Sequence, residues 1–289
     1  MIWFVDSAEQ TPTPSPARAA IVSVVIGEAH EAAWRTLSAA SWVAYAERIG
    51  VDLIVFKDRI DKTDLARSPA WQKLLIPSLP WIQRYERLIW LDSDIIISET
   101  APDILEFAGP PEKVSLSREG SRLSPAEAQI YLERLRGEST PPDKFDVAWR
   151  QETRMTYVSN GLPPHDEQFN TGVMVLSPQR HKDLFRSVYD SPEITRLYEQ
   201  PHLSHRLLQD DLAHVISPRF NWGIIEPIRL YIQDEVIKDE DPVVIGKLVR
   251  ILMRAELRNG YFLHFYGAMN LLKFFMGVPI GQPAAAAAA

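Results

Sequence analysis

Leu88–Ile97 reads LIWLDSDIII, an apolar run that is interrupted only by Asp92, Ser93 and Asp94. An apolar run of this length with polar residues on both sides is typical of a buried strand in an α/β sheet. Carboxylates at the carboxyl end of such a strand lie in the crevice where open sheets of this class bind ligands. The stretch therefore predicts an α/β fold that carries Asp92 and Asp94 at its binding edge.

Asp92 and Asp94 are two residues apart, which in an extended segment directs both side chains to the same side of the chain. Two carboxylates on one side can bind one hard divalent cation, Mg²⁺ or Mn²⁺. The competing interpretation is a solvated turn, since Asp-x-Asp is a common tripeptide. The apolar neighbours favour the metal, because carboxylates beside a core strand are costly unless a cation or hydrogen-bond donors satisfy them.

The segments before this stretch predict a β-α-β unit. Residues 20–27 (AIVSVVIG) and 51–56 (VDLIVF) are candidate strands, and the apolar residues of 31–50 recur at helical spacing. Such units build parallel sheets with right-handed crossovers. The first strand-to-helix junction, at Gly27 and Glu28, is a natural place for a nucleotide, although it lacks the glycine-rich fingerprint of dinucleotide-binding proteins.

Length, charge and cysteine content limit the classes of function that are possible. The chain has 289 residues, 46% of them apolar, which suffices for one sizeable core. A net charge of −7 argues against a general nucleic-acid binder. The sequence has no cysteine, so a metal must be held by oxygen or imidazole, and a reducing, cytoplasmic location is expected. No apolar run is long enough to predict a membrane-spanning helix.

We expect one domain over residues 20–283, after a flexible leader at 1–19 and before an artificial or arbitrary tail of alanines at 284–289. Residues 118–168 are rich in charge and proline, so we expect an insertion that forms a lid or binds an acceptor. Residues 68–85 have a helical pattern that carries Lys73. That lysine either reaches a diphosphate or is an ordinary surface lysine.

Two later segments carry polar residues that suit a ligand site. Residues 169–177 (FNTGVMVLS) predict a turn and a strand in which Asn170 and Gly172 can face a ligand. Residues 207–216 (LLQDDLAHVI) predict an amphipathic helix that opens with Gln209, Asp210 and Asp211. Acidic residues in a first helical turn often serve only the helix dipole.

The C-terminal part predicts a basic helix followed by an aromatic stretch. Residues 245–258 place basic side chains opposite apolar ones, which indicates a surface helix with a solvated basic face. The sharper alternative is a peripheral contact with a membrane. His264 lies in the stretch YFLHFYG and is either a satisfied core histidine or a metal ligand.

The order of these motifs resembles the GT-A nucleotide-sugar glycosyltransferases, above all glycosyltransferase family eight, which includes glycogenin and bacterial lipopolysaccharide galactosyltransferases. The motifs that carry the resemblance are WQKLLIPSLP, RLIWLDSDIII, FNTGVMVLS, QDD with a downstream FNW, and HFYG, spread over roughly residues 20–275. The resemblance implies a single GT-A domain with a mixed, mainly parallel sheet flanked by helices.

The resemblance also implies roles for individual residues. Mn²⁺, or Mg²⁺, would be bound by Asp92, Asp94 and His264. The family's Asp-Gln pair aligns with Gln209–Asp210 or with Asp210–Asp211, so all three are candidate catalytic residues. One departure is Asn270, which stands where the family has a lysine and weakens a pyrophosphate contact by Lys273. The donor-binding positions are Gly27, Glu28, Lys73, Asp92, Ser93, Asn170, Thr171, Gly172, Gly267 and Lys273.

The implied activity is transfer of a hexose from a nucleotide diphosphate sugar to a glycan or glycolipid acceptor. UDP is the expected nucleotide, and retention of anomeric configuration is the expected outcome. Inversion is the alternative, with a carboxylate of residues 118–168 as the base. Two other functions stay open, a sugar-phosphate nucleotidyltransferase and a non-catalytic nucleotide-sugar or carbohydrate-binding protein. The former would need a glycine-rich phosphate loop, which residues 26–28 do not supply. The sequence predicts no oligomeric state.

Overall fold

The computed structural model describes residues 2–6, 10–13, 15–120, 123–136, 145–191, 197–231 and 241–266. The strands are β1 (Ile2–Val5), β2 (Ala19–Val24), β3 (Asp52–Phe56), β4 (Arg87–Leu91), β5 (Ile95–Ile97), β6 (Val114–Arg118), β7 (Phe169–Leu176), β8 (Ala213–Val215), β9 (Trp222–Gly223) and β10 (Phe262–His264). The α-helices are α1 (Glu28–Leu37), α2 (Ala39–Ile49), α3 (Pro125–Arg136), α4 (Phe145–Ser159), α5 (Pro178–Tyr189), α6 (Gln200–Gln209), α7 (Ile225–Tyr231) and α9 (Pro242–Asn259).

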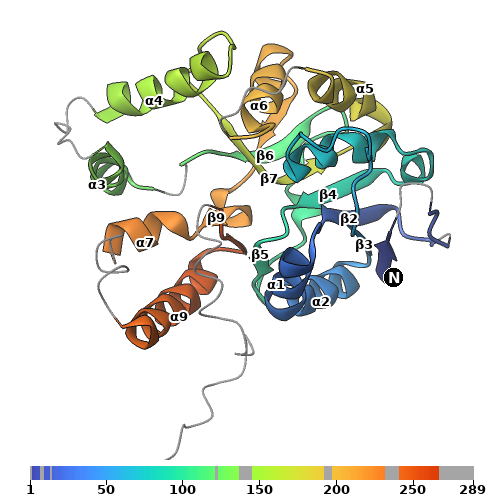
Figure 1. Cartoon of the computed structure of the whole chain (residues 1–289), viewed down its shortest axis with the longest axis horizontal. Coiled ribbons are helices and arrows are strands. Elements are labelled where there is room, and N and C mark those ends of the chain that lie inside the picture. The colour runs from blue at the N-terminus through green and yellow to red at the C-terminus, as the bar shows by residue number, and fades with distance from the viewer. Residues whose placement is uncertain are drawn as a thin grey trace, which may run out of the picture.

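The strands form two sheets (Figure 1). The central sheet has seven strands in the order β1-β3-β2-β4-β7-β6-β8, and the smaller sheet has the order β5-β10-β9. In the central sheet β1, β3, β2 and β4 are mutually parallel, whereas β7 runs antiparallel to both β4 and β6. The mixed, mainly parallel sheet that the family resemblance implied is therefore confirmed.

This topology brings the ends of several strands to one edge of the central sheet. Leu91, the last residue of β4, pairs with Val173 in the middle of β7, and Arg118, the last residue of β6, pairs with Phe169, the first residue of β7. The carboxyl ends of β4 and β6 thus flank the amino end of β7. Asp92 follows β4 at this edge, which is the position predicted for a ligand-binding carboxylate.

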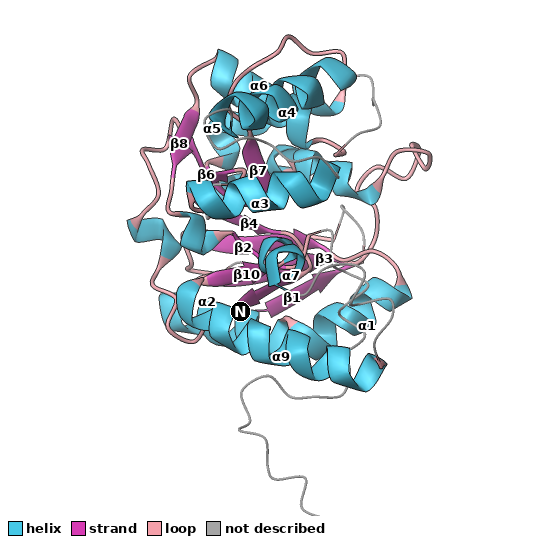
Figure 2. Cartoon of the chain, turned by 90° about the vertical axis from the view of Figure 1, so that its left-hand side faces the viewer, coloured by secondary structure: helices cyan, strands magenta, loops and turns pink. Residues whose placement is uncertain are grey.

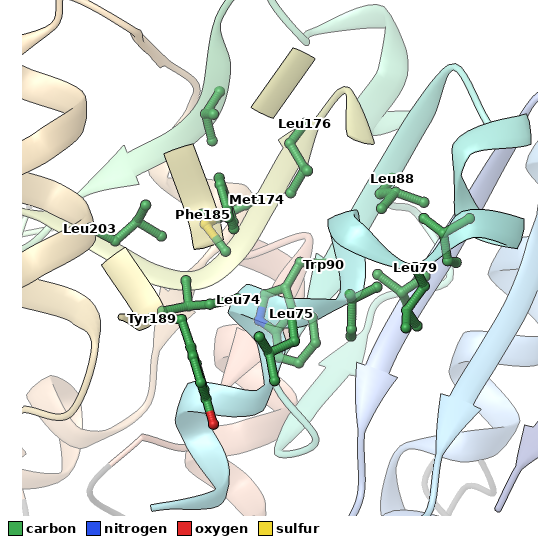
Figure 3. Close-up of a cluster of buried hydrophobic side chains, with 14 of the residues drawn as sticks. Leu74, Leu75, Leu79, Leu88, Trp90, Met174, Leu176, Phe185, Tyr189 and Leu203 are labelled. Atoms are coloured by element: carbon green, nitrogen blue, oxygen red, sulfur yellow. The ribbon is translucent and has the colours of Figure 1, made fainter. Parts of the chain in front are cut away.

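The apolar core lies on both faces of the central sheet. Because successive side chains of a strand alternate between faces, Leu88 and Trp90 of β4 pack in one cluster and Ile89 and Leu91 in another. Figure 3 shows the first cluster, in which side chains of β4 and β7 meet Leu74 and Phe185. The helices α5 and α6 cover this face, and α1 and α2 cover the other (Figure 2). Residue 92 therefore follows a strand that is fixed on both sides.

The stretch LIWLDSDIII is two strands rather than one. β4 ends at Leu91, the chain turns at residues 92–94, and β5 pairs with β10 in the smaller sheet. Carboxylates are costly in the middle of a buried sheet, which explains why the chain changes sheets at this point. The turn brings Asp92 and Asp94 next to β10.

Four other segments differ from the sequence prediction. Residues 31–50 form two helices that meet at Ser38, and residues 68–85 form the 3-10 helices Pro69–Ser78 and Pro80–Arg84, since Pro77 and Pro80 lack the N–H that an α-helix needs. Residues 2–5 of the expected leader are the edge strand β1. The insertion predicted at 118–168 is not one of these four differences, and its described part contains α3 and α4.

The fourth difference is residues 207–216, which are not one helix. Helix α6 ends at Gln209, Asp211 adopts a left-handed φ of 52°, and the chain continues as β8. By contrast, the basic helix expected at 245–258 is confirmed as α9. Among the described helices, none is both long and apolar enough to cross a bilayer.

Candidate metal centre and adjoining polar pocket

Asp92, Asp94 and His264 meet at the edge of the central sheet. One ligand atom from each of the three residues lies within 4.8 Å of the others. His264 Nε2 is 3.2 Å from Asp94 Oδ1 and 3.8 Å from Asp92 Oδ2. The three side chains come from the turn after β4 and from β10, which the pairing of β5 with β10 holds together.

Hydrogen bonds fix the imidazole of His264 with Nε2 toward the carboxylates. Its Nδ1 lies 2.7 Å from Asn221 Oδ1. The amide of Asn221 donates through Nδ2 to Asn170 Oδ1 at 2.8 Å, so its Oδ1 is left to accept. Nδ1 therefore carries the hydrogen and donates it to Asn221. In the neutral imidazole this leaves the Nε2 lone pair for a metal, an arrangement common in metal sites.

Gly172 makes room for this histidine. A Cβ atom on Gly172 would lie 2.1 Å from His264 Cε1 and 2.7 Å from its Nδ1. The Gly172 N–H also donates to Asn170 Oδ1 at 2.9 Å, and its carbonyl accepts from the Asp92 N–H at 2.8 Å. Gly172 thus contacts both the imidazole and the aspartate turn, and any larger residue would displace one of them.

Lys73 lies beneath the aspartate turn and is buried. Its Nζ is 2.8 Å from Asp92 Oδ1, 2.7 Å from Glu199 Oε1 and 3.4 Å from the Thr171 carbonyl. An ammonium group has three N–H donors, and these contacts use all three. Lys73 therefore orients Asp92. Because all three donors are already used within the protein, the predicted contact with a diphosphate does not fit this geometry.

The pKa values of these groups follow from burial and pairing. Burial by itself would lower the pKa of Lys73, but the carboxylates of Asp92 and Glu199 more than offset it and raise the value. Burial raises the pKa of Glu199, and Lys73 opposes the rise. Burial would raise the pKa of Asp94 and lower that of His264. Their mutual attraction outweighs it, so the pKa of Asp94 falls and that of His264 rises.

Glu199 and Gln200 join the centre from the start of α6. Glu199 Oε1 accepts from the Thr171 hydroxyl at 2.9 Å, and Gln200 Oε1 accepts from the Thr171 N–H at 3.3 Å. The two residues before them, Leu197 and Tyr198, have left-handed φ values of 65° and 54°. Such strain in residues other than glycine clusters at functional sites.

A polar pocket adjoins the aspartate and histidine cluster. Glu119, directly after β6, accepts from Asn170 Nδ2 at 2.9 Å and from Gln200 Nε2 at 3.3 Å. Burial, followed by the nearby Glu226, raises the pKa of Glu119 to about 6. The pocket is lined by Ser117, Arg118, Glu119, Gly120, Asn170, Asn221, Glu226 and Tyr266. Its amides, carboxylates and hydroxyls are the groups that hydrogen-bond a sugar.

The candidate catalytic residues at 209–211 do not belong to this site. Val114, at the start of β6, donates its backbone N–H to the carbonyl of Leu212, which follows Asp211. That is the opposite end of β6 from Glu119. Asp210 pairs with Arg206, and the exposed Asp211 pairs with Lys113. Both acids lie at the far edge of the sheet, and Gln209 ends α6.

The remaining predicted positions are distributed as follows. Asn170, Thr171 and Gly172 contact the centre as described above. Gly27, with φ 96°, and Glu28 follow β2, whose carboxyl end is at the same edge as that of the parallel strand β4. The Ser93 carbonyl accepts from the Ser38 hydroxyl at 3.4 Å. The other two predicted positions, Gly267 and Lys273, lie outside the described residues.

Sequence reasoning missed four residues of this site: Glu119, Glu199, Gln200 and Asn221. The sequence does carry one signal, because Glu199–Gln200 is an acidic residue followed by glutamine, as in the family's Asp-Gln pair, and lies ten residues before Gln209–Asp210. Asn221 was part of the quoted FNW motif but had no role assigned. Nothing in the sequence around Glu119 indicates its place in the pocket.

The three candidate ligands fit a divalent ion. Metal–ligand distances to nitrogen and oxygen are about 2.0–2.2 Å, so ligand atoms across one ion lie about 4.2 Å apart. The observed spread of 4.8 Å needs only small side-chain movements. Two carboxylates and a neutral imidazole suit Mn²⁺ or Mg²⁺.

No protein-family model and no curated protein matches the chain. Among solved structures, a glycosyltransferase involved in the glycosylation of the major capsid of PBCV-1 is 14% identical, with 90% of this chain and 100% of that chain covered and a TM-score of 0.51. The galactosyltransferase LgtC, in complex with donor and acceptor sugar analogues, is 13% identical with 92% and 98% covered and a TM-score of 0.49. GlyE of Streptococcus pneumoniae TIGR4 is 12% identical with 86% and 54% covered and a TM-score of 0.45. The likeness to the capsid glycosyltransferase shows that this chain shares the fold of that protein.

Proposed function

We propose that this chain is a metal-dependent glycosyltransferase that moves a hexose from a nucleotide diphosphate sugar to a glycan or glycolipid. The observation that carries the proposal is the meeting of Asp92, Asp94 and His264 at the binding edge of the sheet. The shared fold supports it, because the capsid enzyme of PBCV-1 is itself a glycosyltransferase. UDP is the proposed nucleotide on the strength of the family resemblance alone.

The chain's own residues hold this centre in a fixed geometry. A divalent ion bound there would supply Lewis-acid stabilisation of the departing diphosphate. Asp92 is oriented by Lys73 and by the Trp90 indole N–H, which donates to Asp92 Oδ1 at 2.9 Å. His264 is oriented by Asn221. Asp92 and His264 are therefore each held by buried partners outside the ligand set, which lowers the cost of organising the site when substrate binds.

The polar pocket beside the centre is the proposed site of the transferred sugar. Glu119 and Glu226 would accept hydrogen bonds from sugar hydroxyls, and the Asn170 amide would line the same pocket. Gln200 replaces Asp210 and Asp211 as the residue proposed to face the reacting carbon, because its amide contacts both Glu119 and the Thr171 backbone. We propose retention of anomeric configuration, which NMR of the product would test.

The experiment that tests this function measures turnover of a panel of UDP- and GDP-sugars with Mn²⁺ and with a chelator. Wild type, Asp94→Asn and Asp210→Asn are compared. The two variants make the same chemical change, one in the proposed centre and one at the opposite edge of the sheet. We expect Mn²⁺-dependent hydrolysis or transfer from one donor, lost in Asp94→Asn and kept in Asp210→Asn.

Two results would reject the proposal. Turnover that is unaffected by the chelator and by Asp94→Asn would remove the metal centre from the reaction. If no donor is turned over, calorimetry in the same samples decides the matter. Metal-dependent nucleotide-sugar binding without turnover would indicate a binding protein, and the absence of any binding would reject the assignment altogether.

A further inference from the structure

The outer face of α9 combines exposed aliphatic and basic side chains. Lys247, Ile251, Arg254 and Arg258 are spaced four, three and four residues apart, so they lie on one side of the helix. The exposed fraction of Ile251 is 66%, and that of Val243 is 60%. Val244 and Leu248 extend the apolar part of this face. We name these seven exposed residues (Val243, Val244, Lys247, Leu248, Ile251, Arg254 and Arg258) the α9 outer face.

Within the described part of the chain, these side chains are exposed and do not belong to a buried cluster. The opposite side of α9 supplies Ile245, Val249 and Met253 to a buried cluster that includes Leu263 of β10. None of the three basic residues of the α9 outer face forms an ion pair with a described residue. Large aliphatic side chains gathered on an exposed helix face indicate a contact with something else.

The charge of the helix identifies the kind of partner. Among the 18 residues of α9, four are basic and only Glu256 is acidic. Glu256 is buried, where its carboxylate accepts from the Trp222 indole N–H, so the α9 outer face carries no negative charge. The whole chain, by contrast, has a net charge of −7. A positive face on an acidic protein complements an anionic surface.

We infer that the α9 outer face docks on an anionic lipid bilayer. Helices that lie in the membrane interface combine aliphatic residues, which enter the headgroup and acyl boundary, with Lys and Arg, which contact lipid phosphates. Lys247, Arg254 and Arg258 supply the charge, and Ile251 lies among them. A nucleic acid would use the charge but not the aliphatic residues, so a bilayer explains the composition of the face better.

The docking face is directly connected to the metal centre. Helix α9 ends at Asn259, and Gly260 and Tyr261 lead into β10, which carries His264. The bond between Glu256 and Trp222 also ties α9 to the segment that carries Asn221, the partner of His264. Docking through α9 would therefore hold the proposed active site near the bilayer surface. The inference goes beyond the proposed function, because lipid binding can be measured without any donor or metal.

The test is co-sedimentation of the purified full chain with vesicles of phosphatidylcholine alone and of phosphatidylcholine mixed with phosphatidylglycerol. The key variant is Arg254→Glu with Arg258→Glu. The matched control is Arg180→Glu with Arg186→Glu on α5, which changes the net charge equally. Figure 1 shows α5 and α9 on opposite sides of the molecule. A second variant, Ile251→Asn, tests the aliphatic contribution without a change of charge.

We expect wild type and the α5 control to bind the anionic vesicles and not the neutral ones, with binding weakened by salt. Each basic residue near an anionic surface contributes a factor of about five, so the α9 variant should lose at least roughly 25-fold in partition. Ile251→Asn should lose several-fold. We expect each variant to fold, because all the changed side chains are exposed, and circular dichroism is the check.

Three outcomes would overturn the inference. The first is no binding of wild type to anionic vesicles. The second is equal loss in the α5 control, which would make the effect one of net charge rather than of the α9 outer face. The third is binding to a soluble polyanion, such as RNA, that Arg254→Glu with Arg258→Glu abolishes while vesicle binding is absent. That result would assign the face to nucleic acid instead.

Discussion

Gly172→Ala should break the metal centre by displacing His264. The new Cβ would lie 2.1 Å from His264 Cε1, whereas non-bonded carbons are normally about 3.5–4.0 Å apart, so the overlap is roughly 1.4 Å. The imidazole has little room to move, because it is buried and held between Asn221 and Asp94. The backbone of Gly172 has no positive φ, so the clash alone is the perturbation.

The expected magnitude has two parts. Overpacking a well-packed interior costs about 1–3 kcal/mol of folding free energy. Moving the imidazole affects metal affinity directly, and even loss of an outer partner of a metal ligand weakens affinity about 10–100-fold, so we expect at least a 100-fold loss of Mn²⁺ affinity. Titration calorimetry with Mn²⁺ measures the affinity, and thermal unfolding measures the stability.

Gly50→Ala is the matched control. Gly50 has a left-handed φ of 70° at the end of α2, and a Cβ there would meet no atom within 4 Å. The change costs about 1–2 kcal/mol of folding free energy from backbone strain alone. It should leave Mn²⁺ affinity unchanged. A folded Gly172→Ala protein that binds Mn²⁺ as tightly as wild type would refute the assignment of His264 as a ligand.

Three further predictions concern charge. Pairing with Asp94 raises the pKa of His264, so protons compete with the metal for its imidazole. The Mn²⁺ affinity measured by calorimetry should therefore fall up to about tenfold for each pH unit below that pKa, and an affinity independent of pH would contradict this. Folding raises the pKa of Glu119 from 4.5 to about 6, so the stability that its protonated form contributes is present below pH 4.5 and is lost as the pH rises through 6. In denaturant unfolding, the free energy of unfolding of Glu119→Gln should depend less on pH than that of wild type, by up to about 2 kcal/mol over that range. Parallel curves for the two proteins would count against the raised pKa. Lys73→Met leaves the carboxylates of Asp92 and Glu199 without their cation and should cost about 3–5 kcal/mol in the same assay, with partial recovery in the double variant with Glu199→Gln; no recovery would mean that the pair is not coupled.

The sequence predicted the sheet well because its strands are apolar on both faces. The residues of β2, β3, β4 and β7 are almost all buried, and continuous apolar runs of that kind indicate strands even when the neighbouring strands are unknown. The local sequence does not predict that LIWLDSDIII is divided between two sheets. It depends on the pairing of β5 with β10, which is more than 160 residues away in sequence.

The site was predicted only in part for the same reason. Asp92 and Asp94 stand out locally, but His264 reached the ligand set through the family resemblance rather than through its apolar surroundings. Residues 209–211 became candidates through the family's Asp-Gln pair, and the structure places them away from the centre, where the expected helix start is a helix end followed by a left-handed turn. Glu199 and Gln200 matter through tertiary contacts to Lys73 and Thr171, which no local pattern encodes.

The central claim is that Asp92, Asp94 and His264 bind the divalent ion that the reaction requires. The most direct measurement is anomalous diffraction at the manganese edge from crystals grown with Mn²⁺ and UDP. We expect one strong peak between these three side chains, next to the bound diphosphate, and no such peak in Asp94→Asn crystals. A manganese peak at another place with this cluster empty, or diphosphate bound at the same edge without metal, would contradict it.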